Sequence, residues 1–214
     1  MIEIDSIYNY SDEFENKIIS AYGVKNNKFF SLAFMESGAY VSIGKNSNLA
    51  DTNIRLGKNS RLIIGDDCTL KGRVSIGSFS TVIIGNNLDV TSNLYIRVVE
   101  ATSLSIGDDC LIASDVVIRT NDGHPIYELF SGKHINKGKD ISIGRHVWLG
   151  DQTAILKGVT IGDGSIVAMR SVVTKNVPET TIVAGIPAKV IRSECTWEHS
   201  LSDHTAEYYH NDFE

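Results

Sequence analysis

The sequence predicts an all-β chain wound into a parallel β-helix, and three observations lead to this prediction. An aliphatic residue recurs at six-residue intervals in the C-terminal half, at Ile143, Leu149, Ile155, Ile161, Val167 and Val173. A small or β-branched residue stands four positions after each of these, at Val147, Thr153, Val159, Ser165, Ser171 and Val177. Glycine follows the aliphatic residue of many units, at Gly44, Gly57, Gly65, Gly77, Gly85, Gly107, Gly144, Gly150 and Gly162.

The six-residue period excludes the two common secondary structures. An amphipathic helix repeats about every 3.6 residues and a half-buried strand about every two, so neither keeps this spacing over six units. In a parallel β-helix each unit forms one flat side of a coil and points its aliphatic residue at the axis. Three units make an 18-residue coil. We expect the glycines at the corners, where the missing Cβ lets the backbone turn.

The same pattern is present, but less regular, earlier in the chain. Aliphatic residues carry it at Ile43, Leu56, Ile64, Leu70, Ile76 and Ile84, and again at Ile106, Ile112 and Ile118. The register slips between about residues 82 and 104, and we interpret the slips as bulges or short insertions. Residues 41–178 are therefore expected to form the β-helix, with six to seven coils and a protruding loop at 121–140.

The first 40 residues lack the period and are expected to form an N-terminal cap. An open coil edge invites pairing with other chains, so the first coil needs a cover. An amphipathic segment at residues 12–22 is the candidate, with apolar residues expected on one side at Phe14, Ile18, Ile19 and Tyr22.

Residues 179–214 are expected to form a C-terminal extension that ends in an acidic tail. Its first part, residues 183–191, should lie back along the prism. From residue 193 onward the chain has six acidic residues and no Lys or Arg, so the remainder is neutral, with 20 of each sign. We expect this tail to be a surface appendage with solvated histidines at His199, His204 and His210.

Charge and hydropathy exclude several classes of function. A neutral body gives no basic field for a nucleic acid and no stripe for a membrane surface. The chain has no run of 18 apolar residues, and its first 20 residues are acidic where a signal peptide would be basic and then apolar. We therefore expect a cytoplasmic protein.

The three cysteines, Cys68, Cys110 and Cys195, form neither a disulfide framework nor a metal motif. Cys68 and Cys110 stand at the small inward position of their units, so we expect buried, inert thiols. No metal site is expected.

One stretch interrupts the repeat and carries the chemistry. It runs from Asn121 through His124-Pro125 to Tyr127, continues as a polar loop to Asp140, and is followed by Trp148-Leu149-Gly150. With the Val-Ala-Gly-Ile-Pro-Ala-Lys run that starts at residue 183, these motifs resemble the hexapeptide-repeat acyltransferases. The string from residue 118 to 127 is most similar to their capsule-modifying branch, which includes polysialic acid O-acetyltransferases.

The resemblance implies a left-handed β-helix, a homotrimer with active sites between subunits, acetyl-CoA as co-substrate and a carbohydrate acceptor. It also implies a direct transfer in which His124 is the general base. An imidazole has an unperturbed pKa of about 6.5 and suits the removal of a hydroxyl proton as the oxygen attacks a thioester. The imidazolium can then protonate the leaving thiolate, and no activated serine or cysteine is evident.

Trp148 is expected on an outer face, where it contacts either a neighbouring subunit or the acetyl-pantetheine arm; the resemblance favours the arm. Backbone amides between Trp148 and Gly150 are expected to stabilise the thioester oxygen. His146 should also face outward, in a structural or interfacial role.

The family's motif also indicates where coenzyme A binds. Backbone atoms at Gly150, Ala168 and Met169 should meet the pantetheine, and the phosphates should meet Lys175, Lys189 and Arg192. This chain departs from the family at Arg170, which either adds a phosphate contact or narrows the groove.

The acceptor is expected near Asn93, Tyr127 and His134. Cations close to the loop in sequence suit an anionic glycan, although solvated loop charge explains them equally well: Arg97, Arg119, Lys133, Lys137 and Lys139. Three alternatives stay open: a small-molecule acetyltransferase for an antibiotic or galactoside, a γ-type carbonic anhydrase, for which the histidine spacing is unsuitable, and a non-catalytic scaffold.

Overall fold

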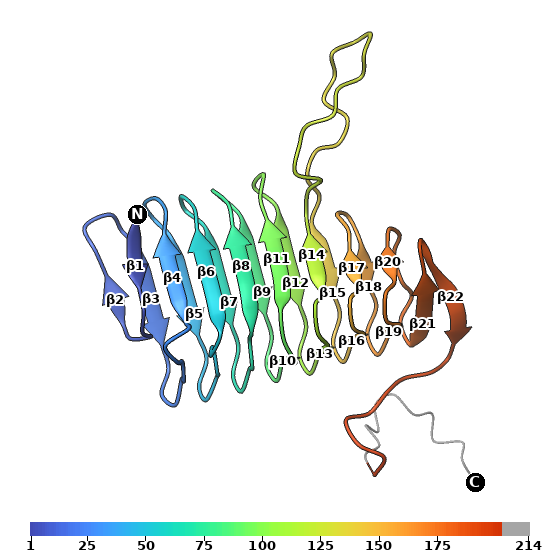
Figure 1. Cartoon of the computed structure of the whole chain (residues 1–214), viewed down its shortest axis with the longest axis horizontal. Helices are drawn as coiled ribbons and strands as arrows, with labels where there is room; N and C mark the ends of the chain where they lie inside the picture. Colours follow the sequence, from blue (N-terminus) through green and yellow to red (C-terminus); the bar gives the residue numbers. More distant parts are fainter. Residues whose placement is uncertain (203–214) are drawn as a thin grey trace.

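The computed structural model describes residues 1–202 and is a left-handed parallel β-helix of about seven turns (Figure 1). This confirms the predicted fold class. Three sheets form the sides of a prism, and the loop after β14 leaves it as a long excursion. No helix long and apolar enough to cross a membrane occurs within residues 1–202.

Each turn of the chain adds one strand to each sheet. Sheet A contains, in order, β1 (Ile2–Ile4), β4 (Ser31–Phe34), β6 (Thr52–Leu56), β8 (Gly72–Ile76), β11 (Leu94–Val98), β14 (Val117–Arg119), β17 (Ala154–Ile155) and β20 (Val172–Val173). Sheet B contains β2 (Tyr10–Ser11), β3 (Lys17–Ser20), β5 (Tyr40–Ile43), β7 (Arg61–Ile64), β9 (Thr81–Ile84), β12 (Ser103–Ile106), β15 (Ile141–Ile143) and β18 (Thr160–Ile161). Sheet C contains β10 (Asp89–Val90), β13 (Leu111–Ile112), β16 (Trp148–Leu149), β19 (Ile166–Val167), β21 (Thr181–Gly185) and β22 (Ala188–Ser193).

The core is the axis of the prism, as the six-residue period predicts. Every aliphatic residue of the repeat from Ile143 to Val173 is at most 2% exposed, and the small residues from Val147 to Val177 are at most 4% exposed. Burying one such aliphatic side chain contributes about 1.5–3 kcal/mol. The stacked rows therefore supply the main stabilisation of the column.

The coils before the loop are longer than the predicted 18 residues. Thr52 pairs with Gly72, and Gly72 pairs with Leu94, so these turns take 20 and 22 residues. After the loop Ser142 pairs with Thr160, and the turn has 18. The slip between residues 82 and 104 is thus a longer side of the prism, with strands of four and five residues, and not a bulge.

Both ends of the column differ from the prediction. Parallel stacking already begins within the first 40 residues, because β3 pairs with β5 and β4 with β6. The covering strands are β1 and β2, which pair antiparallel with β4 and β3.

The segment at residues 12–22 is not one apolar face. Ile18 is buried, but Phe14, Ile19 and Tyr22 are exposed, because a strand turns successive side chains to opposite faces.

At the other end, residues 183–191 do not lie back along the prism. They belong to the antiparallel hairpin of β21 and β22, and β21 itself pairs in parallel with β19. The chain returns along the column only after β22 (Figure 1).

The corner glycines are required for a different reason from the one predicted. A Cβ at Gly44 would lie 2.3 Å from the carbonyl carbon of Gly65 in the next coil, and one at Gly65 would lie 2.5 Å from the carbonyl oxygen of Gly85. The left-handed backbone conformation falls two positions later, for example at Asn46 (φ 56°) and Asp67 (φ 56°). Close stacking, and not turning, therefore selects glycine.

The two thiols predicted to be inert are buried. Cys68 and Cys110 are each 1% exposed and donate hydrogen bonds to the carbonyls of Gly85 and Gly144. Burial raises the pKa of both thiols, that of Cys110 to about 12. Neither can supply a thiolate near neutral pH.

Candidate active site

The loop that bears His124 leaves the prism at the corner between sheets A and B, after β14 and before β15 (Figure 1). Glu100, from the preceding coil, holds both stems of the loop. One carboxylate oxygen accepts a hydrogen bond from the Asn121 side chain at 3.0 Å, and the other accepts one from the Gly138 amide at 2.6 Å. These bonds lower the pKa of Glu100, so the clamp is ionised at neutral pH.

Asn136 joins the two arms of the loop beside His124. Its amide nitrogen donates to Asp122 and to the carbonyl of His124, each at 2.9 Å, and its oxygen accepts from the amide of Ile126 at 2.6 Å. Lys157, in the next coil, donates to Asp122 and, at 2.7 Å, to the carbonyl of Asn136. The backbone at His124 is therefore fixed from the prism itself.

The loop brings together three of the predicted site residues. Tyr127 and His134 form an antiparallel bridge with ring centroids 5.5 Å apart, and the His134 ring contacts the Asn136 oxygen at 2.9 Å. His124 is exposed at the foot of the same loop. Sequence reasoning missed Asn136, Lys157 and Glu100, because their role depends on partners in other coils.

A pair of arginines lies below this loop. Arg97 and Arg119 are neighbours in register on β11 and β14, and the Nε atoms of both are buried without a hydrogen-bond partner among residues 1–202. A Cβ at Gly123 would lie 3.1 Å from Arg119 Nη2, so this guanidinium reaches the turn before His124. The loop cations Lys133, Lys137 and Lys139 are exposed.

Trp148 lies on a different side of the prism, in sheet C. It is outward-facing as predicted, with 38% of its surface exposed. In register it stands between Leu111 and Ile166, and Ile182 follows in the same row. Figure 1 shows β16 in the lower half of the column and the loop at the upper edge. One chain thus does not bring His124 and Trp148 to one place.

The amides of Trp148 and Gly150 are not available for a thioester oxygen, contrary to expectation. The Trp148 amide donates to Ser165 at 3.0 Å and the Gly150 amide to Val167 at 2.8 Å, because both maintain the stacking of coils. Any donor that stabilises the thioester oxygen must therefore be a different group.

The three residues predicted to meet pantetheine are close together. A Cβ at Gly150 would lie 2.8 Å from the amide nitrogen of Met169, whose side chain is exposed. Ala168 follows β19 and donates its amide to Val183. Arg170 instead donates to the Gln152 side chain at 2.8 Å.

The predicted phosphate ligands are exposed near the C-terminal end of the column. Lys189 and Arg192 lie on β22, paired with Ala184 and Ile182, and Lys175 follows β20. Three strand steps separate β16 from β22, a distance of about 14 Å along sheet C.

Asn93 does not join the loop cluster within one chain. It precedes β11 at the corner between sheets C and A and donates to Asp115 at 3.2 Å. The loop leaves from the other end of sheet A, about 17 Å away for a five-residue strand.

The acidic tail is not wholly a surface appendage. Trp197, in its first part, is 7% exposed, and it covers His146, which is 1% exposed and therefore not solvent-facing. His199 contacts Asp109 at 2.9 Å. His204 and His210 lie outside the described residues. Within residues 1–202 no group of three His, Cys, Asp or Glu side chains is placed to hold a metal ion.

Comparison with known proteins identifies a family and its enzymes. Residues 140–175 match the family model described as bacterial transferase hexapeptide (six repeats). The chain is 38% identical over 144 residues to a polysialic acid O-acetyltransferase of Escherichia coli, covering 67% of this chain and 44% of the relative. It is 36% identical to the polysialic acid O-acetyltransferase of Neisseria meningitidis, with 70% of each covered.

Solved structures give the same result over more of the chain. A crystallographic structure of the polysialic acid O-acetyltransferase OatWY superposes with a TM-score of 0.82 at 34% identity, covering 90% of this chain and 92% of the other. The polysialic-acid-specific acetyltransferase NeuO superposes with a TM-score of 0.74 at 30% identity, covering 88% and 81%.

Proposed function

Because the chain belongs to the hexapeptide-repeat acyltransferase family, we propose that it transfers an acetyl group from acetyl-CoA to a hydroxyl of an anionic carbohydrate. One observation carries the proposal: Asn136 and Lys157 fix the turn of an exposed histidine, His124, on an excursion from the column. A scaffold has no need to hold an imidazole in this way. The acceptor class follows from the similarity to polysialic acid O-acetyltransferases.

In the proposed reaction His124 acts as general base and then as general acid. Its imidazole takes the proton of the sugar hydroxyl while the oxygen attacks the thioester carbon, and a tetrahedral intermediate forms. Collapse of this intermediate breaks the carbon–sulfur bond, and the imidazolium returns the proton to the thiolate of coenzyme A. The products are an acetyl ester and free coenzyme A, with no acyl-enzyme.

The proposed active site requires more than one copy of the chain. His124 and Trp148 belong to different sides of the prism, so a site that uses both joins the loop of one subunit to sheet C of another. A homotrimer with three such interfaces satisfies this requirement with closed symmetry. Gly150, Ala168 and Met169 would then line the pantetheine, with Lys189 and Arg192 farther along toward the phosphates.

The arginine pair supports an anionic acceptor. Arg97 and Arg119 present two guanidinium groups at the foot of the loop, and guanidinium is suited to bidentate binding of carboxylate. The carboxylates of sialic acid residues would complete the hydrogen bonding of these side chains beside the hydroxyl donor of the reaction.

The test is a complementation experiment between two inactive variants. His124→Ala and Trp148→Ala are each assayed for thiol release from acetyl-CoA with polysialic acid as acceptor. We expect His124→Ala to lower turnover about 10²- to 10⁴-fold. Co-expressed as mixed trimers, the two variants should recover about one quarter of the wild-type activity, because one site in four combines an intact His124 with an intact Trp148.

Two results would contradict the proposal. Unchanged turnover of His124→Ala removes this residue as the base. No recovery in mixed trimers shows that the site does not combine the two residues from different subunits. His199→Ala is the matched control, because this histidine lies outside the loop and should leave turnover near the wild-type value.

A further inference from the structure

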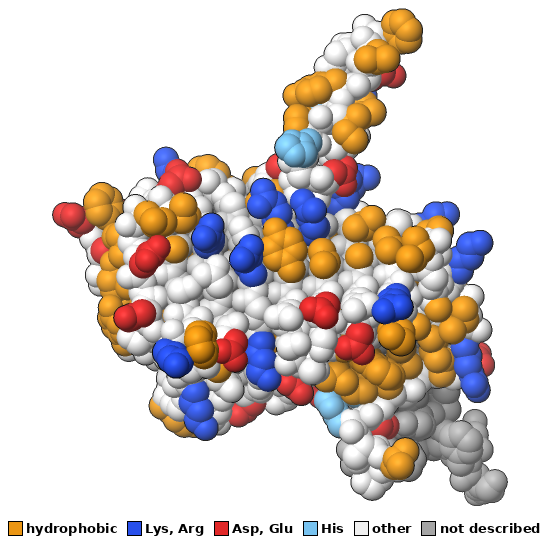
Figure 2. All heavy atoms as spheres, in the orientation of Figure 1, with side chains coloured by type: hydrophobic (Ala, Val, Ile, Leu, Met, Phe, Trp, Pro, Cys, Tyr) orange, Lys and Arg blue, Asp and Glu red, His pale blue; other side chains and the backbone are white. Residues whose placement is uncertain are grey.

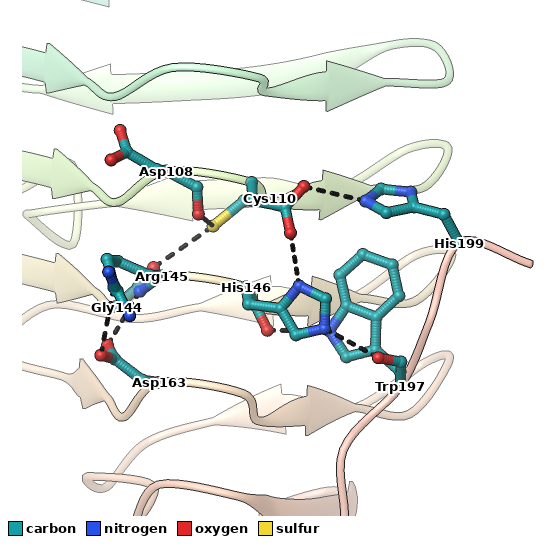
Figure 3. Close-up of polar contacts among 9 residues, drawn as sticks. Asp108, Cys110, Gly144, Arg145, His146, Asp163, Trp197 and His199 are labelled. Carbon is teal, nitrogen blue, oxygen red and sulfur yellow. Dashed lines mark hydrogen bonds and ion pairs between the residues drawn. The ribbon is translucent and has the colours of Figure 1, made fainter. Parts of the chain in front are cut away.

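The segment that follows β22 returns along the column and covers one corner beside Trp148. Figure 3 shows Trp197 lying flat against His146 in this region. The two ring centroids are 4.4 Å apart at an interplanar angle of 9°, and both side chains are buried. We call residues 194–202 the C-terminal strap.

Reciprocal hydrogen bonds fix the strap to the corner. The indole Nε1 of Trp197 donates to the carbonyl of His146 at 2.8 Å. The imidazole Nε2 of His146 lies 2.7 Å from the carbonyl of Trp197. Each residue therefore binds the other's backbone while their rings stack, and this geometry allows little freedom for either ring.

Asp109, in the preceding coil, extends the contact to a second strap residue. One carboxylate oxygen lies 2.6 Å from His146 Nδ1, and the other lies 2.9 Å from His199 Nε2. Carboxylate and carbonyl oxygens are acceptors, so the ring of His146 satisfies both of its contacts when each nitrogen carries a proton.

The corner occupied by His146 has a defined place in the repeat. Earlier coils carry a short polar residue at the same left-handed position, namely Asn46, Asp67, Asn87 and Asp109. His146 has the same conformation, with φ at 53°. Its longer side chain reaches the strap, where Asn or Asp would not provide an aromatic face.

The strap meets the residue that the proposed function places at the acyl donor. The Trp197 and Trp148 rings are 6.2 Å apart at 49°, and Trp148 starts the strand that follows His146 by one residue. Leu111 and Ile166 border Trp148 within sheet C. Trp197 adds a contact from outside the sheet.

We propose that Trp197 is a positioning residue, which holds Trp148 in the orientation that receives the acetyl-pantetheine arm. This inference rests on the proposed function, because it assigns the donor to Trp148. A half-exposed indole on a two-residue strand otherwise samples several rotamers. Loss of an aromatic pair corresponds to about a 2- to 12-fold change in an equilibrium, so a rise of that size is expected in KM for acetyl-CoA.

The experiment uses the fact that the chain has only two tryptophans. Two indoles at this separation and angle should give an exciton couplet in far-ultraviolet circular dichroism. The full-length variants Trp197→Phe, Trp197→Ala and His146→Asn are compared, because Asn tolerates the left-handed conformation at residue 146. Leu201→Ala, an exposed strap residue, is the control.

We expect Trp197→Phe and Trp197→Ala to abolish the couplet, which requires both indoles, and His146→Asn to weaken it. Trp197→Ala and His146→Asn should raise KM for acetyl-CoA about 2- to 12-fold, with little change in KM for the acceptor. Trp197→Phe keeps ring stacking and should raise it less. The double variant should be no worse than the single variants, because both act through one contact.

Three results would overturn the inference: no couplet in the wild type, an unchanged KM for acetyl-CoA when the couplet is lost, or an equal effect of Leu201→Ala. Coenzyme A binding, followed by tryptophan fluorescence without acceptor, separates the two proposals. If coenzyme A binds and this binding weakens in Trp197→Ala while no acetyl transfer occurs, the strap inference stands and the proposed reaction fails.

Discussion

Replacing Gly44 with alanine tests whether close stacking of coils determines the corner glycines. The new Cβ would lie 2.3 Å from the carbonyl carbon and oxygen of Gly65. Relief to an ordinary contact of about 3.4 Å needs a shift of about 1 Å between coils spaced about 4.8 Å apart. That shift strains the 2.8 Å hydrogen bond from the Gly44 amide to Ile64. Overpacking of this kind costs about 1–3 kcal/mol.

The measurement is thermal unfolding at one protein concentration. A chain of this size loses about 2–4 °C per kcal/mol, so Tm should fall by roughly 2–12 °C. Gly77→Ala is the matched control, because its Cβ would meet only the Val99 residue, at 3.0 Å or more, and mainly its side chain. Its Tm should change less. If Gly44→Ala melts at or above the Gly77→Ala temperature, crowding between coils is not the reason for glycine.

The remaining predictions concern the loop and the thiols. Lys157→Met removes the hydrogen bonds to Asp122 and to the loop backbone, so acetyl transfer should fall about 10-fold or more while Tm changes by less than about 2 °C. The hydrogen bond from Lys157 lowers the pKa of Asp122; the stabilisation is therefore complete above the ordinary carboxyl range and is lost in acid as the pH falls through the lowered value. Limited proteolysis should show the loop opening at a higher pH in Lys157→Met than in the wild type. A thiol reagent at pH 8 should modify Cys195 in the folded chain well before Cys110, whose pKa is about 12; similar rates would contradict its burial.

The sequence predicts the column well because its determinants are local and repeated. Residues such as Ile143 and Thr153 point inward by virtue of their place in the unit, and each is buried. The early coils were harder to predict because their sides contain extra residues, as in the 22-residue turn from Gly72 to Leu94. A fixed period of six does not follow a side that varies in length.

The candidate site was predictable only in part. His124, Tyr127 and His134 stand in a stretch that breaks the period, and this interruption marks them. Asn136 has no such mark, since its role depends on contacts with His124 and with Lys157 in another coil. Trp197 was missed because the acidic residues around it indicated a solvated tail, and its burial depends on His146, 51 positions away.

The loop insertion leaves the register of the column unchanged. Leu104 pairs with Ile141 although 37 positions separate them, whereas Ser142 pairs with Thr160 after only 18. A corner can therefore accommodate an insert of very different length while the strands on either side continue to stack. Acceptor preference could diversify among related enzymes through exchange of this one excursion, with the load-carrying architecture inherited intact.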